Sequence, residues 1–215
     1  MCGVAGFLID SQFSSSMNYD AVIKKMTNSI KHRGPNDSGS WNNFLDGIFL
    51  GHRRLSILDL SEAGHQPMES SNDRYVIAFN GEIYNHLQIR SEIEKSNKNI
   101  SWRGHSDTET ILCAFETFGI EASIKKFNGM FAFSLWDRKN KVLTLARDRL
   151  GEKPMYYGWQ KSKNGKVFLF GSELKALAAH PCFENKLDKR SVALFMRYSY
   201  VPDPYSIFEG IHKVP

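Results

Sequence analysis

A β-hairpin pattern over residues 130–147 constrains the possible folds of this chain more than any other feature. Large apolar residues alternate with smaller ones over 131–135, as expected of a strand with one buried face. A polar turn at 137–141 follows, and a second strand pattern begins at Val142. Strands joined by so short a turn run antiparallel. The sequence therefore predicts a sheet that is at least partly antiparallel.

Strand and helix patterns alternate over the rest of the chain. Apolar runs of strand length occur at 4–9, 48–58, 75–79, 156–159 and 167–170. Helix patterns occur at 20–32, around 87–94, after Asp107, at 173–179 and at 189–198. Asn80–Gly81 is a turn signal that should end the strand at 75–79, and residues 106–109 fit a capping box. We predict an α+β fold with sheets between layers of helices.

Composition excludes several classes of protein. The 215 residues are 41% hydrophobic and 24% charged, and they contain neither an apolar window of membrane-spanning length nor a secretory signal. We therefore expect a cytoplasmic protein with no membrane partner. The net charge of +5 is dispersed among acidic residues, which argues against nucleic-acid binding. Three scattered cysteines form no disulfide or zinc pattern, so we expect no metal site.

Cys2 is the first candidate for catalysis. Removal of the initiator methionine tolerates a small second residue, and it would leave Cys2 with a free α-amine beside its own thiol. An α-amine with a pKa of about 8 suits a general base near neutral pH, and a thiol is intrinsically nucleophilic. Such a pair needs no catalytic histidine. The alternative is that Cys2 is a small buried residue of the first strand, and the cysteine alone does not decide between the two.

A series of motifs favours the catalytic alternative. In chain order they are MCGVAG at 1–6, HRGP at 32–35, GHRRLSI at 51–57, FNGEIYNH at 79–86, SD at 106–107, FNGMFAF at 127–133, RDRLGEKP at 147–154 and SELKAL at 172–177. This series resembles the glutaminase domain of asparagine synthetases, which are class II glutamine amidotransferases and N-terminal nucleophile hydrolases. The likeness covers nearly the whole chain. One departure is that Asn36 precedes Asp37, where relatives often have aspartate directly after the HRGP motif.

The resemblance implies a fold and a reaction. The fold is a four-layer αββα arrangement, with two stacked and mainly antiparallel sheets and the nucleophile at the start of an inner strand. The reaction is hydrolysis of L-glutamine to glutamate and ammonia through a thioester on Cys2. The side-chain amide of Asn80 and the backbone N–H of Gly81 would hold the oxyanion. Without the family, Asn–Gly is most often only a hairpin turn.

The resemblance also implies a clamp for the α-amino acid end of glutamine. Arg54 would hold the carboxylate through its planar guanidinium, whereas strand alternation points Arg53 to the opposite face. Glu82 and Asp107 would face the α-ammonium group. The alternatives are a surface ion pair for Arg54 and a helix start for Asp107. The expected substrate-binding residues are Arg54, Leu55, Ser56, Ile57, Leu58, Asn80, Gly81, Glu82 and Asp107.

Asparagine synthetases carry a second, C-terminal domain that activates aspartate with ATP. Neither its pyrophosphate loop nor a Walker-type loop occurs here, so we expect no cofactor in this chain, with ATP and Mg²⁺ confined to the missing synthetase domain. We expect a glutaminase domain over 2–195, a connector toward the synthetase domain over 196–215, and a truncated piece of a longer enzyme. The alternatives are an acceptor in polysaccharide or secondary-metabolite synthesis, or a silent glutamine-binding or regulatory domain. Assembly as a homodimer is a further expectation.

Overall fold

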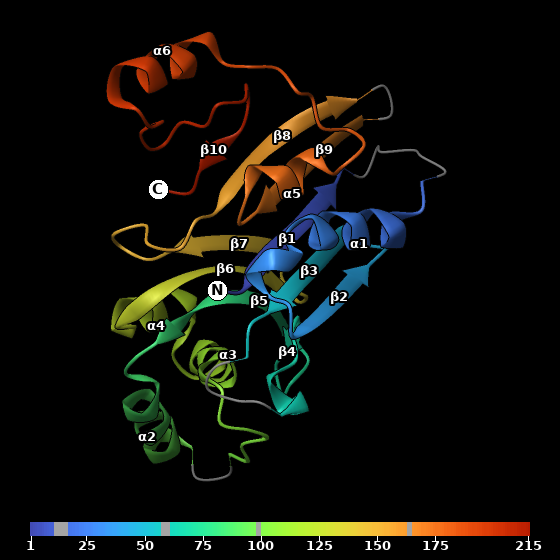
Figure 1. The fold of residues 1–215 in the computed structure, drawn as a ribbon. Coiled ribbons are helices and arrows are strands. Elements are labelled where there is room, and N and C mark those ends of the chain that lie inside the picture. Colours follow the sequence, from blue (N-terminus) through green and yellow to red (C-terminus); the bar gives the residue numbers. More distant parts are fainter. Residues whose placement is uncertain (11–16, 57–60, 98–99, 163–164) are drawn as a thin grey trace.

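The computed structural model describes residues 1–10, 17–56, 61–97, 100–162 and 165–215. Figure 1 shows two stacked sheets with helices on their outer faces. The first sheet has the order β10-β8-β9-β1-β3-β2 and the second β4-β5-β6-β7, and every strand pair is antiparallel. This α+β, four-layer αββα fold confirms the predicted fold class.

The strands of the first sheet come from both ends of the chain. They are β1 (Gly3–Ile9), β2 (Asp37–Asn43), β3 (Ile48–Arg54), β8 (Tyr156–Ser162), β9 (Gly165–Gly171) and β10 (His212–Lys213). The second sheet is formed by the middle of the chain. Its strands are β4 (Met68–Glu69), β5 (Tyr75–Ile83), β6 (Gly129–Asp137) and β7 (Val142–Arg147). β6 and β7 are the hairpin that the alternating pattern predicts.

Helices cover each sheet on its outer side. The first sheet carries α1 (Tyr19–Ser29) and α5 (Leu174–Ala178), and the second carries α2 (His86–Ser96), α3 (Asp107–Phe118) and α4 (Ile120–Lys126) (Figure 1). Two short 3₁₀ helices, η1 (Lys31–Arg33) and η2 (Glu62–Gly64), lie in loops. α6 (Lys189–Tyr198) includes residue 195, where we placed the domain boundary, and β10 of the expected connector pairs with β8. The division at residue 195 stays a prediction.

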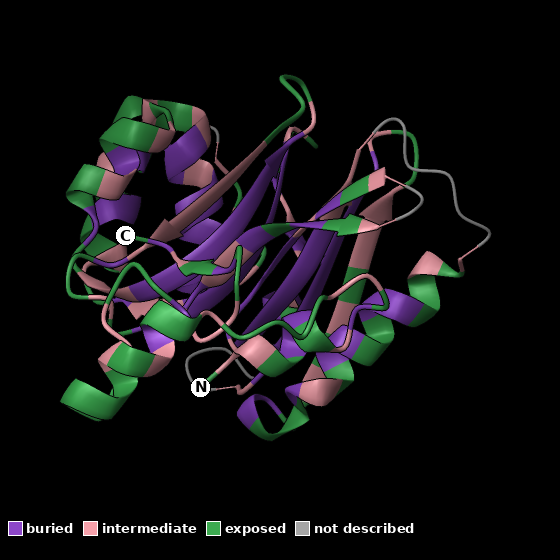
Figure 2. Cartoon of the chain, turned by 90° about the horizontal axis from the view of Figure 1, so that it is seen from above, coloured by how far each residue is buried: buried purple, intermediate pink, exposed green. Residues whose placement is uncertain are grey.

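Three apolar clusters fill the spaces between the four layers, and Figure 2 shows the buried strands in the interior. The alternation of side chains along each strand decides which cluster a residue joins. In β1, Val4 faces the opposite sheet and Phe7 faces the helices; in β5, Ala78 faces the opposite sheet and Ile77 the helices. Even-numbered residues of β1, β3 and β5 therefore point into the space between the sheets. Candidate site residues 2, 54, 80 and 82 share this parity.

The prediction that β5 ends at Asn80–Gly81 is wrong. The strand continues to Ile83, because Asn80 and Gly81 stay paired with residues of β6. Glycine is required at position 81 by this neighbour, since a Cβ there would lie 2.6 Å from the Cα of Phe131. Asn–Gly often forms a turn, but here it stays in a strand because β6 is long enough to pair with it.

Other boundaries differ for physical reasons. The strand predicted over 48–58 ends at Arg54, and residues 57–60 lie outside the described ones. β2 was not predicted because its sequence, DSGSWNN, is largely polar, as an edge strand allows. The capping box forms only in part. Ser106 Oγ accepts from the N–H of Glu109 at 3.3 Å, but the Glu109 carboxylate accepts from the N–H groups of Arg103 and Gly104 instead of Ser106.

The close approach of strands around Gly6 gives a test of this packing. A Cβ at position 6 would lie 2.7 Å from the carbonyl oxygen of Phe49 and would also overlap the Phe170 ring. We expect Gly6→Ala to lower the free energy of unfolding by about 1 to 3 kcal/mol, measured by urea denaturation. Ser40→Ala, an exposed change on β2, is the control and should have little effect. Equal stability of the Gly6 variant and the wild type would contradict this packing.

Candidate active site

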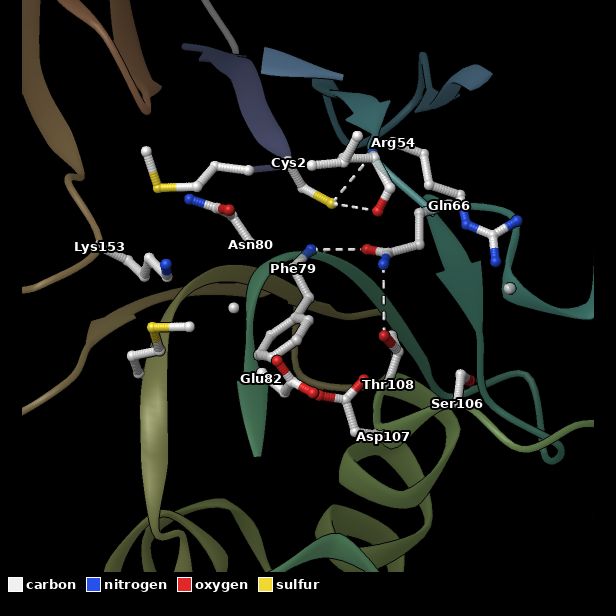
Figure 3. Close-up of a pocket in the computed structure, with 15 residues that line it drawn as sticks. Cys2, Arg54, Gln66, Phe79, Asn80, Glu82, Ser106, Asp107, Thr108 and Lys153 are labelled. Atoms are coloured by element: carbon white, nitrogen blue, oxygen red, sulfur yellow. Dashed lines mark hydrogen bonds between the residues drawn. The ribbon is translucent and has the colours of Figure 1, made fainter. Parts of the chain in front are cut away.

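A pocket lies where the start of β1, the end of β3 and the C-terminal half of β5 meet (Figure 3). The cavity has a volume of about 120 Å³ and opens to solvent at its mouth. Its walls combine apolar residues with a thiol, amides, carboxylates and two cations. They are Met1, Cys2, Arg54, Leu55, Gly64, Gln66, Phe79, Asn80, Gly81, Glu82, Ser106, Asp107, Thr108, Met130 and Lys153.

The thiol of Cys2 is held at the pocket wall by the backbone of Leu55. Its Sγ lies 3.4 Å from the nitrogen of Leu55, which donates to it, and 3.7 Å from the carbonyl oxygen of the same residue. Burial raises the pKa of the Cys2 thiol above its usual value, while the Leu55 N–H and the Arg54 guanidinium act in the opposite direction. The thiol is therefore mainly protonated near neutral pH, and a nucleophilic role requires a base.

Asn80 carries a buried donor with no protein partner. Its side chain is 1% exposed and lines the pocket, and its Nδ2 makes no hydrogen bond to any described residue. A buried amide N–H left without an acceptor is unfavourable by about 1 to 3 kcal/mol. A ligand oxygen in the pocket would remove this penalty, so Asn80 Nδ2 is suited to bind one.

The N–H of Gly81 points toward the pocket edge of β5. In an antiparallel ladder, alternate residues direct their N–H groups to the same edge. Phe79 donates on this edge to Gln66 Oε1 at 2.7 Å, and Ile83 donates to Asp107 Oδ2 at 2.9 Å. Gly81 lies between them and lines the pocket. The backbone therefore presents a second donor next to Asn80.

The two arginines of the GHRRLSI motif point to opposite sides of β3. Arg54 is buried, lines the pocket and donates from Nη1 to the carbonyl oxygen of Ser61 at 2.8 Å. Arg53 faces α1, where its Nε donates to the carbonyl oxygen of Thr27 at 3.3 Å and its Nη2 contacts the Asn28 side chain. Only Arg54 of this pair can reach a ligand in the pocket.

Two carboxylates lie together at the base of the pocket. Figure 3 shows Glu82 and Asp107 facing each other, from β5 and from the first turn of α3. Burial raises the pKa of Asp107 to about 6, and the neighbouring Glu82 contributes to the increase. This pair is an anionic site for a cationic group of a ligand.

The remaining expected residues are placed differently. Leu55 lines the pocket, but Ser56 does not, and its N–H donates to Asn36 Oδ1 at 3.2 Å. Ile57 and Leu58 lie outside the described residues. Sequence reasoning assigned no site role to eight further lining residues. Five of them lie within the motifs given above, whereas Gly64, Gln66 and Thr108 lie outside them. The eight residues are Met1, Gly64, Gln66, Phe79, Ser106, Thr108, Met130 and Lys153.

The described residues contain neither a metal-ligating cluster nor a membrane-spanning helix. No group of three or more His, Cys, Asp or Glu side chains there could hold a metal ion. None of the helices described is long and apolar enough to span a bilayer.

The chain is similar to proteins of one known family. The family model described as "Glutamine amidotransferase domain" matches residues 1–215. A protein of Methanocaldococcus jannaschii named as a glutamine-hydrolyzing asparagine synthetase is 38% identical over 232 residues, covering the whole chain and 42% of the relative. Asparagine synthetase [glutamine-hydrolyzing] 3 of Bacillus subtilis is 35% identical, covering the whole chain and 33% of the relative. The chain thus spans well under half the length of these relatives.

A solved structure shares the fold. Glutamine phosphoribosylpyrophosphate amidotransferase from B. subtilis, complexed with ADP and GMP, superposes with a TM-score of 0.63 at 19% identity, covering 83% of this chain and 43% of the other. The family model thus matches the full length of the chain, and the solved structure has the same fold. This chain belongs to the glutamine amidotransferase domain family, as a class II member with the N-terminal nucleophile hydrolase fold.

Proposed function

We propose that this domain hydrolyses L-glutamine to L-glutamate and ammonia, with Cys2 as the nucleophile. The observation that carries the proposal is the pair of donors beside the Cys2 thiol, the unpartnered Asn80 Nδ2 and the edge N–H of Gly81. Two donors on one pocket wall suit the oxyanion of a tetrahedral intermediate. The family to which the chain belongs supports the same reaction.

The reaction uses the α-amine that Met1 removal exposes on Cys2. This amine takes the thiol proton as the sulfur attacks the carboxamide carbon, and the carbonyl electron pair moves to oxygen, where Asn80 and Gly81 donate to it. The protonated amine then gives its proton to the leaving nitrogen, which departs as ammonia and leaves a thioester on Cys2. Water attacks the thioester with the amine again as base, and glutamate is released. The raised pKa of the buried thiol explains why a base is needed.

The other end of the substrate fits the remaining polar residues. Arg54 would bind the α-carboxylate through its planar guanidinium, and Glu82 and Asp107 would bind the α-ammonium group. These groups stand on three elements, β3, β5 and α3. The clamp therefore recognises an α-amino acid and directs its side chain toward Cys2.

The ammonia would be used by a second catalytic unit. Since the two relatives are named as asparagine synthetases and are more than twice as long, we propose that a C-terminal, ATP-dependent synthetase domain consumes it to form asparagine from aspartate. ATP and Mg²⁺ would bind there. We further propose that the protein is cytoplasmic and assembles as a homodimer.

The nucleophile assignment predicts a processed N-terminus. Intact mass should show loss of Met1 in the active protein, and Cys2→Ala should abolish glutamine hydrolysis while leaving the unfolding transition nearly unchanged. Cys113→Ala and Cys182→Ala are the matched controls and should stay active, because neither cysteine lines the pocket. Full activity with Met1 retained, or equal loss in all three variants, would contradict the mechanism.

The roles of Arg54 and Asn80 predict different kinetic effects. Arg54→Lys keeps the charge but loses the planar fork, so it should raise the KM for glutamine far more than it lowers kcat. Asn80→Ala removes an oxyanion donor and should lower kcat by roughly 10² to 10³. Steady-state kinetics of ammonia release measure both. Arg53→Lys is the control and should change neither constant; a larger effect there than at Arg54 would show that the clamp is assigned to the wrong arginine.

The pKa of Asp107 predicts how substrate binding depends on pH. Below a pKa of about 6 the carboxyl is protonated and no longer attracts the α-ammonium group, which stays charged throughout this range. The KM for glutamine should therefore rise as the pH falls from 7 to 5. Asp107→Asn, which can still accept from the N–H of Ile83, should have a raised KM at pH 7 and little further change on acidification. A KM of the wild type that is constant from pH 7 to 5 would contradict this role.

A further inference from the structure

The backbone of Phe79, directly before the two proposed oxyanion donors, is held by two buried side chains. Its N–H donates to Gln66 Oε1 at 2.7 Å, and its carbonyl oxygen lies 2.9 Å from His52 Nε2. Gln66 is 5% exposed and His52 is fully buried. Neither residue belongs to β5, so both bonds fix β5 from other parts of the fold.

Gln66 connects β5 to the helix that carries Asp107. It lies in the loop before β4, and its Nε2 donates to Thr108 Oγ1 at 3.3 Å in the first turn of α3 (Figure 3). The same side chain therefore contacts the strand of the oxyanion donors and the helix of the ammonium site. Gln66 therefore fixes the position of β5 relative to the first turn of α3.

His52 connects the two sheets at the same point. It lies on β3, two residues before Arg54 and on the same face, and it reaches across to the carbonyl oxygen of Phe79 on β5. That oxygen can only accept, so Nε2 carries the hydrogen. Burial lowers the pKa of His52 to about 4, which keeps the ring neutral near pH 7. This hydrogen bond therefore links β3, which carries Arg54, to β5, which carries the proposed oxyanion donors.

These bonds replace a missing partner strand. β4 pairs only with Val76 and Ile77, so within the described part of the chain no strand lies beside the edge of β5 after Ile77. Side chains take over at Phe79, through Gln66, and at Ile83, through Asp107. The N–H of Gly81 between them is left directed to the pocket. An N–H on an unpaired strand edge can serve as an oxyanion donor only if the residues on either side of it are held in place.

We propose that His52 and Gln66 are positioning residues, which hold Phe79 so that the donors of Asn80 and Gly81 keep their place relative to the Cys2 thiol. The proposal rests on the proposed glutaminase function and adds to it two residues that need not touch the reacting atoms. A misplacement of about 1 Å in a catalytic group can lower a rate by about 10²-fold. Loss of either bond should therefore lower kcat more than it raises KM.

The test compares variants that lose a bond to Phe79 with variants that keep it. Gln66→Met and His52→Leu remove the acceptor and the donor. Gln66→Glu retains an acceptor for the N–H of Phe79, and His52→Gln retains a donor near the position of Nε2. His180→Leu is the matched control, because His180 is a buried histidine that does not line the pocket. For each variant we would measure kcat, KM, thermal stability and the affinity for the γ-aldehyde analogue of glutamine.

The aldehyde reports on the oxyanion site separately from the clamp. The Cys2 sulfur adds to its carbonyl carbon and forms a C–S bond, while the thiol proton passes to the α-amine of Cys2. The carbonyl π electron pair moves to the oxygen, and Asn80 and Gly81 would bind the resulting oxyanion. Binding of L-glutamate, which forms no such bond, reports on the clamp alone. A residue with a purely structural role would change stability without changing the ratio of these two affinities.

We expect Gln66→Met and His52→Leu to lower kcat by about 10- to 100-fold, to change KM less than about threefold, and to weaken aldehyde binding in parallel with kcat. Gln66→Glu and His52→Gln should recover most of kcat, and His180→Leu should lower stability only. An unchanged kcat, an equal fall in kcat for His180→Leu, or unchanged aldehyde affinity would overturn the positioning role. Hydrolysis by the wild type and its loss in Cys2→Ala are established first, so failure of the glutaminase function is seen separately.

Discussion

The face-to-face packing of the two sheets determines which side chains can meet at the site. Because strand side chains alternate, packing Val4 against residues such as Ala78 also turns Cys2 and Asn80 toward the same space. The apolar cluster between the sheets fills most of that space. The pocket lies at one end of this space. There, the even-numbered residues Cys2, Asn80 and Arg54 bring together a thiol, an amide and a guanidinium. A shift of one residue in any of these strands would point its site residue into the outer helical layer, as Arg53 shows beside Arg54.

The second constraint is the incomplete edge of β5. A full-length β4 would pair with the N–H of Gly81 and remove it from the pocket. The short β4 leaves that edge to the side chains of Gln66 and Asp107, so the strand is fixed on either side of the Gly81 N–H. Asp107 accepts from the Ile83 N–H, and in the proposed mechanism it is also the anion that binds the substrate. Its burial accounts for its raised pKa.

Sequence reasoning could predict the fold, and it could bring the candidate nucleophile and its expected neighbours to notice, because these features leave local signals. The hairpin of β6 and β7 has a clear alternating pattern, and the family motifs name Cys2, Arg54, Asn80 and Asp107 directly. The turn expected at Asn80–Gly81 was wrong because the long pairing with β6 overrides a dipeptide preference. Gln66 could not be found by pattern, since its role depends on contacts with residues 13 and 42 positions away. In the sequence, His52 is only a residue next to two arginines. Its contact with Phe79 exists only when the two sheets have packed against each other.

Covalent labelling can show whether an unblocked Cys2 reacts with a substrate held by the clamp. The thiol-reactive glutamine analogue 6-diazo-5-oxo-L-norleucine would be added to the full chain and the labelled peptide identified by mass spectrometry, with and without glutamine. We expect one label per chain, on a peptide that begins at Cys2, with a labelling rate that glutamine lowers. A label on Cys113 or Cys182, a label on a chain that keeps Met1, or labelling that glutamine does not slow would contradict it.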